Sequence, residues 1–180
     1  MICDSDCRIL SLNPEFGGAA HDAFIWQNSN VNNFMQNLHR NNEIVWLLGD
    51  SGYPQRPWLM TPYPDPLPNS VEDNFNKAHI SARVVIENTF GRLKNRWRCL
   101  SKDRSLHYRP EKCAQIITAC CVLHNIAIKY NIPDPDGVSL QTGAYEQMEV
   151  LQENETSSDL LMGRVLRDQL ATRLSVMNTT

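Results

Sequence analysis

The sequence lacks the features that mark several large classes of protein. None of its apolar runs approaches the roughly 20 residues that a membrane-spanning helix needs, so no such helix is predicted. Its six cysteines in 180 residues are too sparse for a disulfide scaffold. We therefore expect an intracellular protein with free thiols. Internal repeats are absent as well. The length and the 42% hydrophobic content suit one globular domain with a tail.

Charge is distributed unevenly along the chain. The net charge is −3, but residues 74–112 hold ten Lys and Arg against three acids, a net of +7. The remaining residues hold seven Lys and Arg against seventeen acids, a net of −10. A basic block inside an acidic chain indicates contact with a polyanion. The alternative is a solvated helix face, and charge alone does not separate the two.

Hydrophobic periodicity divides the chain into short strands, helices and connections. The apolar run at 44–48 predicts a central strand of an α/β sheet, covered on both faces. Six prolines at 53–68 predict an ordered loop or an exposed connection. The helix predicted at 110–130 is apolar nearly all round, which predicts a buried core helix. The other predicted elements are a hairpin at 1–13, helices at 21–40 and 71–100, an acidic flexible linker at 131–158 and an amphipathic helix at 159–177.

Two carboxylates stand where α/β proteins carry functional acids. Asp50 follows the apolar strand, and ligands bind outside the carboxyl ends of such strands. The alternative for Asp50 is a structural turn residue in GDSG. Glu87 lies in the long helix, where Asn76, His79, Arg83 and Glu87 form one polar stripe. For Glu87 the alternative is an ion pair with Arg83 on a solvated face.

A carboxylate after a strand and another on a later helix can share a divalent cation. Mg²⁺ and Mn²⁺ prefer hard oxygen ligands and bind one or two carboxylates together with waters and substrate phosphates. Asp50 and Glu87 are therefore the predicted catalytic residues and metal ligands, with Mg²⁺ or Mn²⁺ as the cofactor. Cations nearby would hold nucleic-acid phosphates. The predicted nucleic-acid-binding residues are Arg83, Arg92, Lys94, Arg96 and Arg98.

Other residues allow a functional and a structural interpretation. Cys120, Cys121 and His124 would suit half of a zinc site, but the buried helix around them favours core packing. Trp58 in the proline-rich segment is the better candidate for stacking on DNA bases. Trp97 lies on the apolar seam of its helix and is expected in the core.

Several motifs together resemble one known family, the DDE superfamily of endonucleases. The motifs are GDSGYP at 49–54, FNKAHISARVVIENTFGRLKNRWRCL at 75–100, HDAFIWQNS at 21–29, VLHNIAI at 122–128 and, more loosely, RVLRDQL at 164–170. The resemblance is greatest to the transposase of PIF/Harbinger elements and the nuclease derived from it. It implies an α/β, RNase H-like fold, a mixed sheet flanked by helices, and metal-dependent cleavage of DNA phosphodiester bonds.

By motif, the resemblance makes Asp50 the second acid and Glu87 the third acid of an Asp-Asp-Glu triad that holds two Mg²⁺ or Mn²⁺ ions. The family's first acid lies on the first strand, in an Asp-Gly-Thr-His-like motif that this sequence does not contain. Residues 1–130 are therefore expected to form a partial DDE domain without its first strand. Whether the chain is an enzyme stays open, and the alternatives are a non-catalytic DNA- or protein-binding derivative and a transposon relic.

The resemblance also implies partners and a location. DNA is the expected partner, and a separate Myb-like DNA-binding protein is a second one. The expected location is the nucleus, with the cytoplasm as an alternative.

Overall fold

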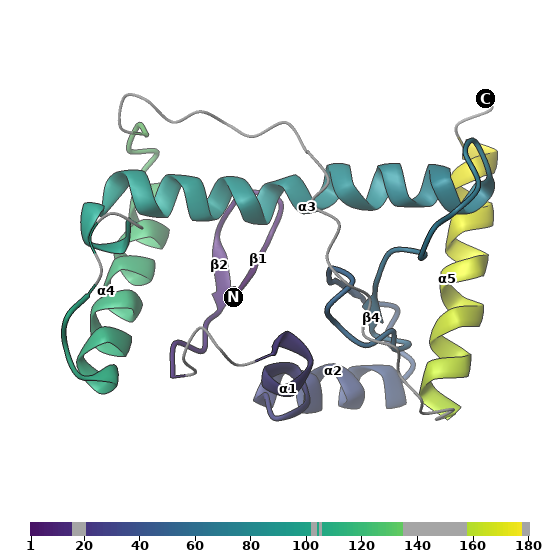
Figure 1. Cartoon of the computed structure of the whole chain (residues 1–180), viewed down its shortest axis with the longest axis horizontal. Helices are drawn as coiled ribbons and strands as arrows, with labels where there is room; N and C mark the ends of the chain where they lie inside the picture. The colour runs from purple at the N-terminus through teal and green to yellow at the C-terminus, as the bar shows by residue number, and fades with distance from the viewer. Residues whose placement is uncertain (16–20, 102–103, 105, 135–157, 178–180) are drawn as a thin grey trace. The chain divides into compact units, whose positions relative to one another are not determined.

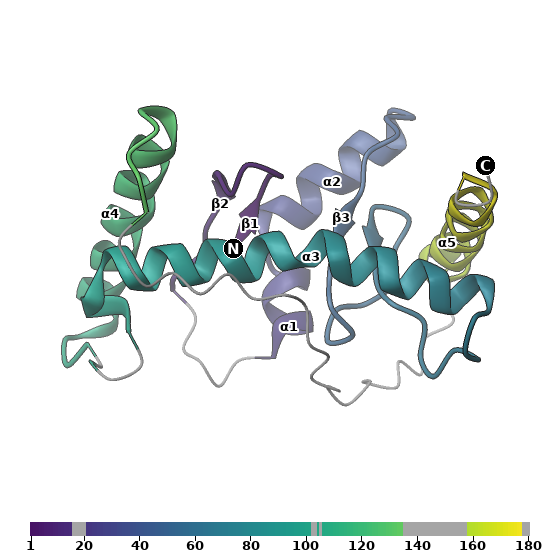
Figure 2. The same cartoon turned by 90° about the horizontal axis from the view of Figure 1, so that it is seen from above.

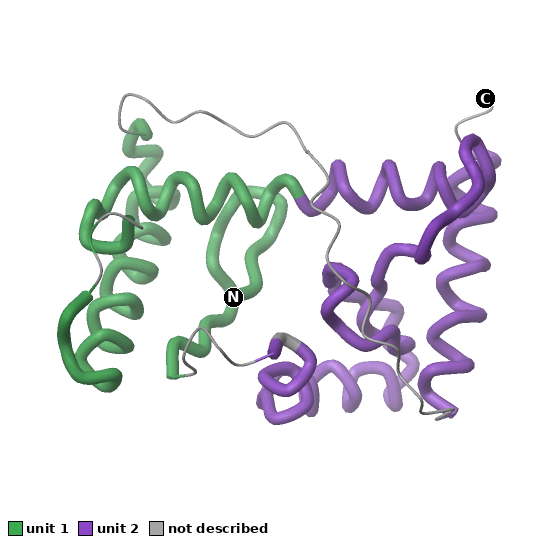
Figure 3. Tube along the Cα trace, viewed as in Figure 1, with its two compact units in different colours: residues 1–19, 84–144 green, residues 20–83, 145–180 purple. Residues whose placement is uncertain are grey.

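The computed structural model describes residues 1–15, 21–101, 104, 106–134 and 158–177, so most of the predicted linker at 131–158 lies outside the described residues. The chain divides into two compact units (Figure 3). Unit 1 comprises Met1–Ala19 and Val84–Ala144, and unit 2 comprises Ala20–Arg83 and Tyr145–Thr180. Each unit combines a small sheet with helices, which agrees with the predicted α/β class. Helix α3 runs from Val71 to Arg96 and contributes to both units (Figure 1 and Figure 2).

Unit 1 is a β-hairpin packed against helices. Its elements are β1 (Ile2–Cys3), β2 (Ile9–Ser11), the second half of α3, a 3-10 helix at Arg98–Leu100 and α4 (Pro110–Lys129). The two strands pair antiparallel, which confirms the predicted hairpin. Ile9 packs against Leu93 of α3 and Cys121 of α4, so the three elements share one small core. Trp97 packs against this core, as predicted from its place on the apolar seam.

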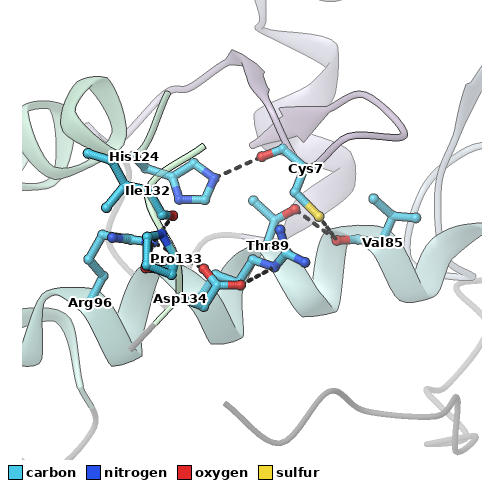
Figure 4. Close-up of polar contacts among 9 residues, drawn as sticks. Cys7, Val85, Thr89, Arg96, His124, Ile132, Pro133 and Asp134 are labelled. Carbon is cyan, nitrogen blue, oxygen red and sulfur yellow. Dashed lines mark hydrogen bonds and ion pairs between the residues drawn. The ribbon is translucent and has the colours of Figure 1, made fainter. Parts of the chain in front are cut away.

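Two neighbouring side chains of α4 hold the hairpin in place. The amide of Asn125 accepts the N–H of Ile9 and donates to the carbonyl of Ile9, both at 2.8 Å. Asn125 thus pairs with β2 as a neighbouring strand would. His124 is 1% exposed, and its Nε2 lies 2.8 Å from the carbonyl oxygen of Cys7 (Figure 4). Because a carbonyl only accepts, Nε2 carries the proton and donates it.

Helix α4 starts at Pro110, a residue favoured in the first turn, as predicted. The prediction of a helix buried all round is wrong, because Val122, Leu123 and Ile126 are all exposed. The hairpin covers only one face of α4, and no other described element covers these three side chains. None of the helices in the described ranges is both long and apolar enough to cross a membrane.

Unit 2 is built around a parallel pair of two-residue strands. Its elements are α1 (Asp22–Gln27), α2 (Asn30–Arg40), β3 (Leu47–Leu48), β4 (Leu59–Met60), the first half of α3 and α5 (Ser158–Met177). Trp26, Met35, Trp58 and Leu59 form its core. The single helix predicted at 21–40 is in fact two helices, because Ser29 caps the second one through its hydroxyl.

The apolar run at 44–48 supplies only the short strand β3. Ile44 is 79% exposed, and Val45, Trp46 and Leu48 are exposed as well. The prediction of a strand covered on both faces is therefore wrong for the described residues. β3 has one strand partner, β4, which lies inside the proline-rich segment. Residues 57–61 of that segment are buried. Its prolines flank the strand and do not interrupt it, so the backbone of residues 58–61 can still form hydrogen bonds.

Polar side chains on the first half of α3 bind the backbone that follows β4. Asn76 accepts the N–H of Tyr63 at 2.8 Å and donates to its carbonyl at 2.9 Å. His79 is 4% exposed, and its Nε2–H donates to the carbonyl of Met60 at 3.2 Å. The predicted polar stripe of α3 therefore contacts the backbone of unit 2 at these two positions: Asn76 satisfies both polar groups of Tyr63, and His79 adds a second donor to the Met60 carbonyl, which also accepts the N–H of Gly49 at 2.9 Å.

Helix α5 covers the range 159–177 in which a helix was predicted. One face of α5 packs against the other elements of unit 2. The buried residues on this face are Leu160, Gly163, Arg167 and Ala171, spaced three and four apart. The carbonyl of Gly163 accepts a hydrogen bond from Gln55 at 2.8 Å. Arg167 donates to the carbonyls of Thr61 and Pro62, both at 3.1 Å.

We expect Gly163→Ala to lower the free energy of unfolding by about 1–3 kcal/mol, the usual range for overpacking. A Cβ at Gly163 would lie 2.7 Å from the backbone carbonyl carbon of Arg56, which cannot rotate away. The control is Gly91→Ala on α3, where a Cβ meets nothing within 4 Å and helix propensity should raise stability slightly. Urea unfolding of both variants measures the difference. Equal stability of wild type and Gly163→Ala would contradict the close approach.

We also expect the buried His79 to make unit 2 less stable in acid. Burial, followed by the charges of Arg83 and Arg167, lowers the pKa of His79 from 6.5 to about 4. The unfolded chain therefore takes up a proton between pH 6.5 and 4 that the folded chain does not, so stability falls as pH falls through this window. His79→Gln should lose about 2 kcal/mol less than wild type between pH 7 and 4.5.

The control for this experiment is His107→Gln, the same substitution at an exposed histidine of unit 1. The readout is the free energy of urea unfolding at a series of pH values. A parallel loss in wild type and His79→Gln would show that His79 is not the group responsible.

Candidate functional site

Asp50 lies directly after β3, at the carboxyl end of the parallel pair in unit 2. Its Oδ1 accepts the N–H of Gly52 at 2.9 Å, and its Oδ2 accepts from Arg83 of α3 at 3.3 Å. The side chain of Asp50 is 24% exposed, as is that of Arg83. The carboxylate thus serves its own turn, as the structural alternative requires, and it also remains open to solvent at the strand end where ligands bind.

Two side chains of α3, His79 and Arg83, determine the charge around Asp50. Arg83 is one helical turn after His79 on α3, and Asp50 raises the pKa of His79 whereas Arg83 lowers it. Burial outweighs both charges and keeps the imidazole neutral at physiological pH. Asp50 therefore has one cationic neighbour, Arg83, and one neutral histidine near it.

Glu87 lies one turn after Arg83 in the sequence of α3 and belongs to unit 1, whereas Asp50 belongs to unit 2. The alternative of an Arg83–Glu87 ion pair is wrong, because Arg83 pairs with Asp50. Glu87 is half-buried and forms no ion pair with any residue that the structure describes. At Gly91, one turn further on, the helix surface is open. Glu87 is therefore a partly accessible carboxylate without a competing cation in the described ranges.

The five predicted nucleic-acid-binding residues fall into two groups. Lys94 and Arg98 are exposed near the end of α3 and in the 3-10 helix that follows. Arg83, Arg92 and Arg96 instead form ion pairs within the chain, Arg83 with Asp50 and the other two with Asp134. Lys94 and Arg98 have no ion pair among the described residues, although the ammonium of Lys94 lies 5.9 Å from the centre of the Phe90 ring, whereas the other three have acidic partners.

A cluster on α5 escaped the sequence analysis. The hydroxyl of Tyr63 donates to Asp168 at 2.6 Å, and the guanidinium of Arg167 lies 3.9 Å from the centre of the Tyr63 ring. Burial and the bond to Asp168 raise the pKa of the Tyr63 hydroxyl. Burial lowers the pKa of Arg167. The signal was present in RVLRDQL, which contains both α5 residues, but it resembled the family only loosely.

Two further side chains were not singled out from the sequence. Asp134 ends the described part of the chain after α4 and binds two arginines. Asn125 pairs with the backbone of β2. Charge and periodicity give no sign of either role, because both depend on which elements pack together.

Trp58 is not available to stack on DNA bases. It is 4% exposed, its indole N–H donates to Asn32 at 3.0 Å, and its ring packs near His39. A proline-rich segment predicts a loop, but this one carries β4 through the core of unit 2. The prediction of a DNA contact by Trp58 is therefore wrong.

Cys120, Cys121 and His124 are core residues, as the structural interpretation predicted. His124 uses Nε2 to hold the hairpin, and all six cysteines are free thiols. Burial raises the pKa of Cys120 to about 11 and also raises that of Cys121, so both stay protonated. Across the described residues, no group of three or more His, Cys, Asp and Glu side chains could hold a metal ion.

The donor chemistry of Asp50 and Glu87 nevertheless fits the hard cations that the predicted site requires. Both offer carboxylate oxygens, both are partly exposed, and neither forms a bidentate pair with an arginine among the described residues. Arg83 reaches Asp50 through a single contact of 3.3 Å, which a divalent cation would oppose electrostatically.

Comparison with known proteins finds relatives of the same kind. The Homo sapiens protein named "Putative nuclease HARBI1" is 36% identical over 178 residues, which cover 97% of this chain and 49% of that protein. The Bos taurus protein of the same name has the same identity and coverage. The Arabidopsis thaliana protein named "Protein ALP1-like" is 28% identical over 194 residues, which cover 99% of this chain and 46% of that protein.

The chain thus spans about half the length of the curated relatives that it matches. No solved structure is significantly similar to it. The family model described as "DDE superfamily endonuclease" matches residues 1–125, more than two thirds of the chain. The match includes β3 with Asp50, the whole of α3 with Glu87, and the His124–Asn125 pair that holds the hairpin. The chain therefore belongs to the DDE superfamily endonucleases.

Proposed function

We propose that the chain carries two of the three acids of a metal-dependent DNA endonuclease site derived from a Harbinger-type transposase, namely Asp50 and Glu87. The observation that carries the proposal is the position of Asp50 at the carboxyl end of the parallel pair β3–β4, within the matched residues. Glu87 supports it as a half-buried carboxylate on α3 without an ion pair in the described ranges. The name "Putative nuclease HARBI1" of the relatives is consistent with this activity.

The residues of this chain would divide the work by their chemistry. Asp50 and Glu87 would hold Mg²⁺ or Mn²⁺, which supplies Lewis-acid activation of water and stabilises the leaving oxygen of a phosphodiester. Asp50 is held in orientation by the N–H of Gly52. Arg83 keeps the charge of Asp50 balanced and lies within reach of a phosphate that approaches the carboxylate. His79 stays neutral and adds no positive charge.

The same proposal includes an RNase H-like sheet, to which the parallel pair β3–β4 of unit 2 would belong. The first acid of the triad has no counterpart that we can assign in residues 1–180. Leu47 and Leu48 of β3 pair with β4 only, and Ile44, Val45 and Trp46 before them are exposed. Such a free, apolar strand edge accepts a further strand. A strand that bears the first acid and pairs there would complete both the sheet and the triad.

DNA is the substrate class that the charges favour. Residues 74–112 carry a net charge of +7, and Lys94 and Arg98 present exposed cations near the end of α3. Glu87 and Lys94 lie on the same helix, α3, and Arg98 lies in the 3-10 helix that follows it. Non-catalytic DNA binding is the second candidate function, and the same exposed cations favour it.

To test the metal site, we expect Asp50→Asn and Glu87→Gln each to weaken Mn²⁺ binding at least about tenfold, because each removes one of two hard oxygen ligands. Electron paramagnetic resonance of free Mn²⁺ measures the binding on the 180-residue chain. Any Mn²⁺-dependent nicking of supercoiled DNA should be abolished in both variants.

Glu72→Gln is the matched control for this experiment, because Glu72 is an exposed carboxylate in the first turn of the same helix. It should bind Mn²⁺ as wild type does. Mn²⁺ binding or nicking that persists in both Asp50→Asn and Glu87→Gln would refute the assignment of the site.

For DNA binding, we expect Lys94→Gln together with Arg98→Gln to reduce the slope of log K against log salt by about 2, since each exposed cation releases about one counterion. Fluorescence anisotropy with a labelled duplex gives this slope. Lys129→Gln with Arg173→Gln removes the same charge from exposed positions on α4 and α5 and should have a smaller effect. Equal slopes in wild type and in the Lys94/Arg98 variant would exclude this surface as the DNA contact.

A further inference from the structure

Arg92 and Arg96 are held by the segment that follows α4, within unit 1. Asp134 contacts Arg92 Nε through Oδ2 and Arg96 Nη2 through Oδ1, both at 3.1 Å (Figure 4). Arg96 Nη2 also donates to the carbonyls of Ile132 at 3.3 Å and Pro133 at 3.1 Å. One carboxylate and two carbonyl oxygens therefore occupy the positions around these guanidinium groups that phosphate oxygens take in a nucleic-acid complex.

The two guanidinium groups are covered but not fully satisfied. The side chain of Arg92 is 26% exposed, and that of Arg96 is 14% exposed. The Nε atoms of both are shielded from solvent and lack a hydrogen-bond acceptor in the part of the chain that the structure describes. Arg92 Nε lies within ion-pair distance of Asp134, but without the geometry of a hydrogen bond. A buried donor without an acceptor costs free energy, so a ligand with more oxygens would be favoured here.

The segment over the arginines is attached by few bonds. The N–H of Asn131 donates to the carbonyl of Ile128 at 3.1 Å, and that of Ile132 donates to the carbonyl of Ala127 at 2.9 Å. Ile132 is 50% exposed. Among the described residues the two arginines are therefore the main attachment of residues 133 and 134, so an anion that takes over these contacts would release them.

We propose that Arg92 and Arg96 form a phosphate-binding site for DNA, and that residues 132–134 cover this site until DNA displaces them. The inference rests on the proposed function, because it assumes that DNA meets the basic residues of α3. Arginine suits such a site, since its planar fork binds phosphate through two donors. A phosphodiester carries one negative charge, as Asp134 does, so the exchange preserves charge balance. Lys94 and Arg98 are exposed and would make the first contact.

A purely structural tie between α3 and the end of α4 is the rival explanation of the same contacts. The two explanations predict different changes in DNA affinity when the Asp134 carboxylate is removed. A tie that only stabilises the fold has no reason to oppose DNA, whereas a cover competes with DNA for the same guanidinium groups. Removal of the Asp134 carboxylate should therefore strengthen DNA binding only if the segment is a cover.

The test uses the 180-residue chain and a labelled DNA duplex over a salt series. We expect Asp134→Asn to bind several-fold more tightly than wild type, with a slope of log K against log salt steeper by about 1 to 2. Arg92→Gln with Arg96→Gln, added to Asp134→Asn, should abolish the gain. Glu111→Gln removes the same charge from an exposed position in the first turn of α4 and controls for net charge.

A second measurement uses the wild-type chain and so does not depend on the stability of a variant. Hydrogen exchange of the Ile132 amide, which is bonded to Ala127, should become faster when DNA is added, because the cover leaves. Slower or unchanged exchange at Ile132, together with an Asp134→Asn variant that binds DNA no more tightly than Glu111→Gln, would overturn the cover. If Lys94→Gln with Arg98→Gln also leaves DNA binding unchanged, DNA does not contact this surface and the cover fails for that reason, whereas the metal site of the proposed function is tested separately by Mn²⁺ binding.

Discussion

The polar side of helix α3 is the constraint on which both units depend. In unit 2, Asn76 pairs with the backbone of Tyr63 after β4, His79 donates to the carbonyl of Met60 in β4, and Arg83 forms an ion pair with Asp50. In unit 1, Arg92 and Arg96 bind the segment after α4. A long helix usually contributes an apolar stripe, but strands of two or three residues leave many backbone groups without ladder partners. Polar side chains of α3 supply hydrogen-bond partners to backbone groups of this kind. These residues therefore stabilise the fold, whatever further function they have.

The short strands explain why helix side chains act as strand partners elsewhere too. Asn125 gives β2 the donor and acceptor of a neighbouring strand, and Arg167 caps carbonyls just after β4. Gly163 lets α5 approach the backbone of Arg56 closely enough for this contact. Such side-chain pairing is specific in geometry, since an amide or guanidinium cannot slip in register as a strand can. It stabilises a sheet edge without extending it.

Periodicity and motif spacing predicted the helices well, because α3, α4 and α5 are long, at 26, 20 and 20 residues, and a long helix repeats its apolar spacing often enough to be recognised. Burial was predicted less well. The run at 44–48 and the far face of α4 are exposed, and Trp58 is buried, because apolar composition does not say which neighbours a segment has. Charge showed where cations gather but not that Asp134 holds two of them. The catalytic roles proposed for Asp50 and Glu87 depend on the motif resemblance, since turn geometry alone fits Asp50 equally well.

Under the proposed function, the internal ion pairs of Arg83, Arg92 and Arg96 keep ligand-binding charged groups paired while no ligand is bound. A nuclease site concentrates carboxylates for metal and arginines for phosphate, and unpaired clusters of one sign repel. In this chain Arg83 lies against Asp50, and Asp134 lies against Arg92 and Arg96, so these five groups have partners of opposite charge, whereas Glu87 has none among the described residues. A metal ion would then replace Arg83 as the cationic partner of Asp50, and a DNA phosphate would replace Asp134 as the anionic partner of Arg92 and Arg96. No half-buried charge would be left without a partner at these positions. The affinity for either ligand would depend on the free energy of the ion pair that the ligand forms minus that of the internal ion pair it replaces. We therefore expect the affinity to change with salt concentration and with the loss of one internal partner.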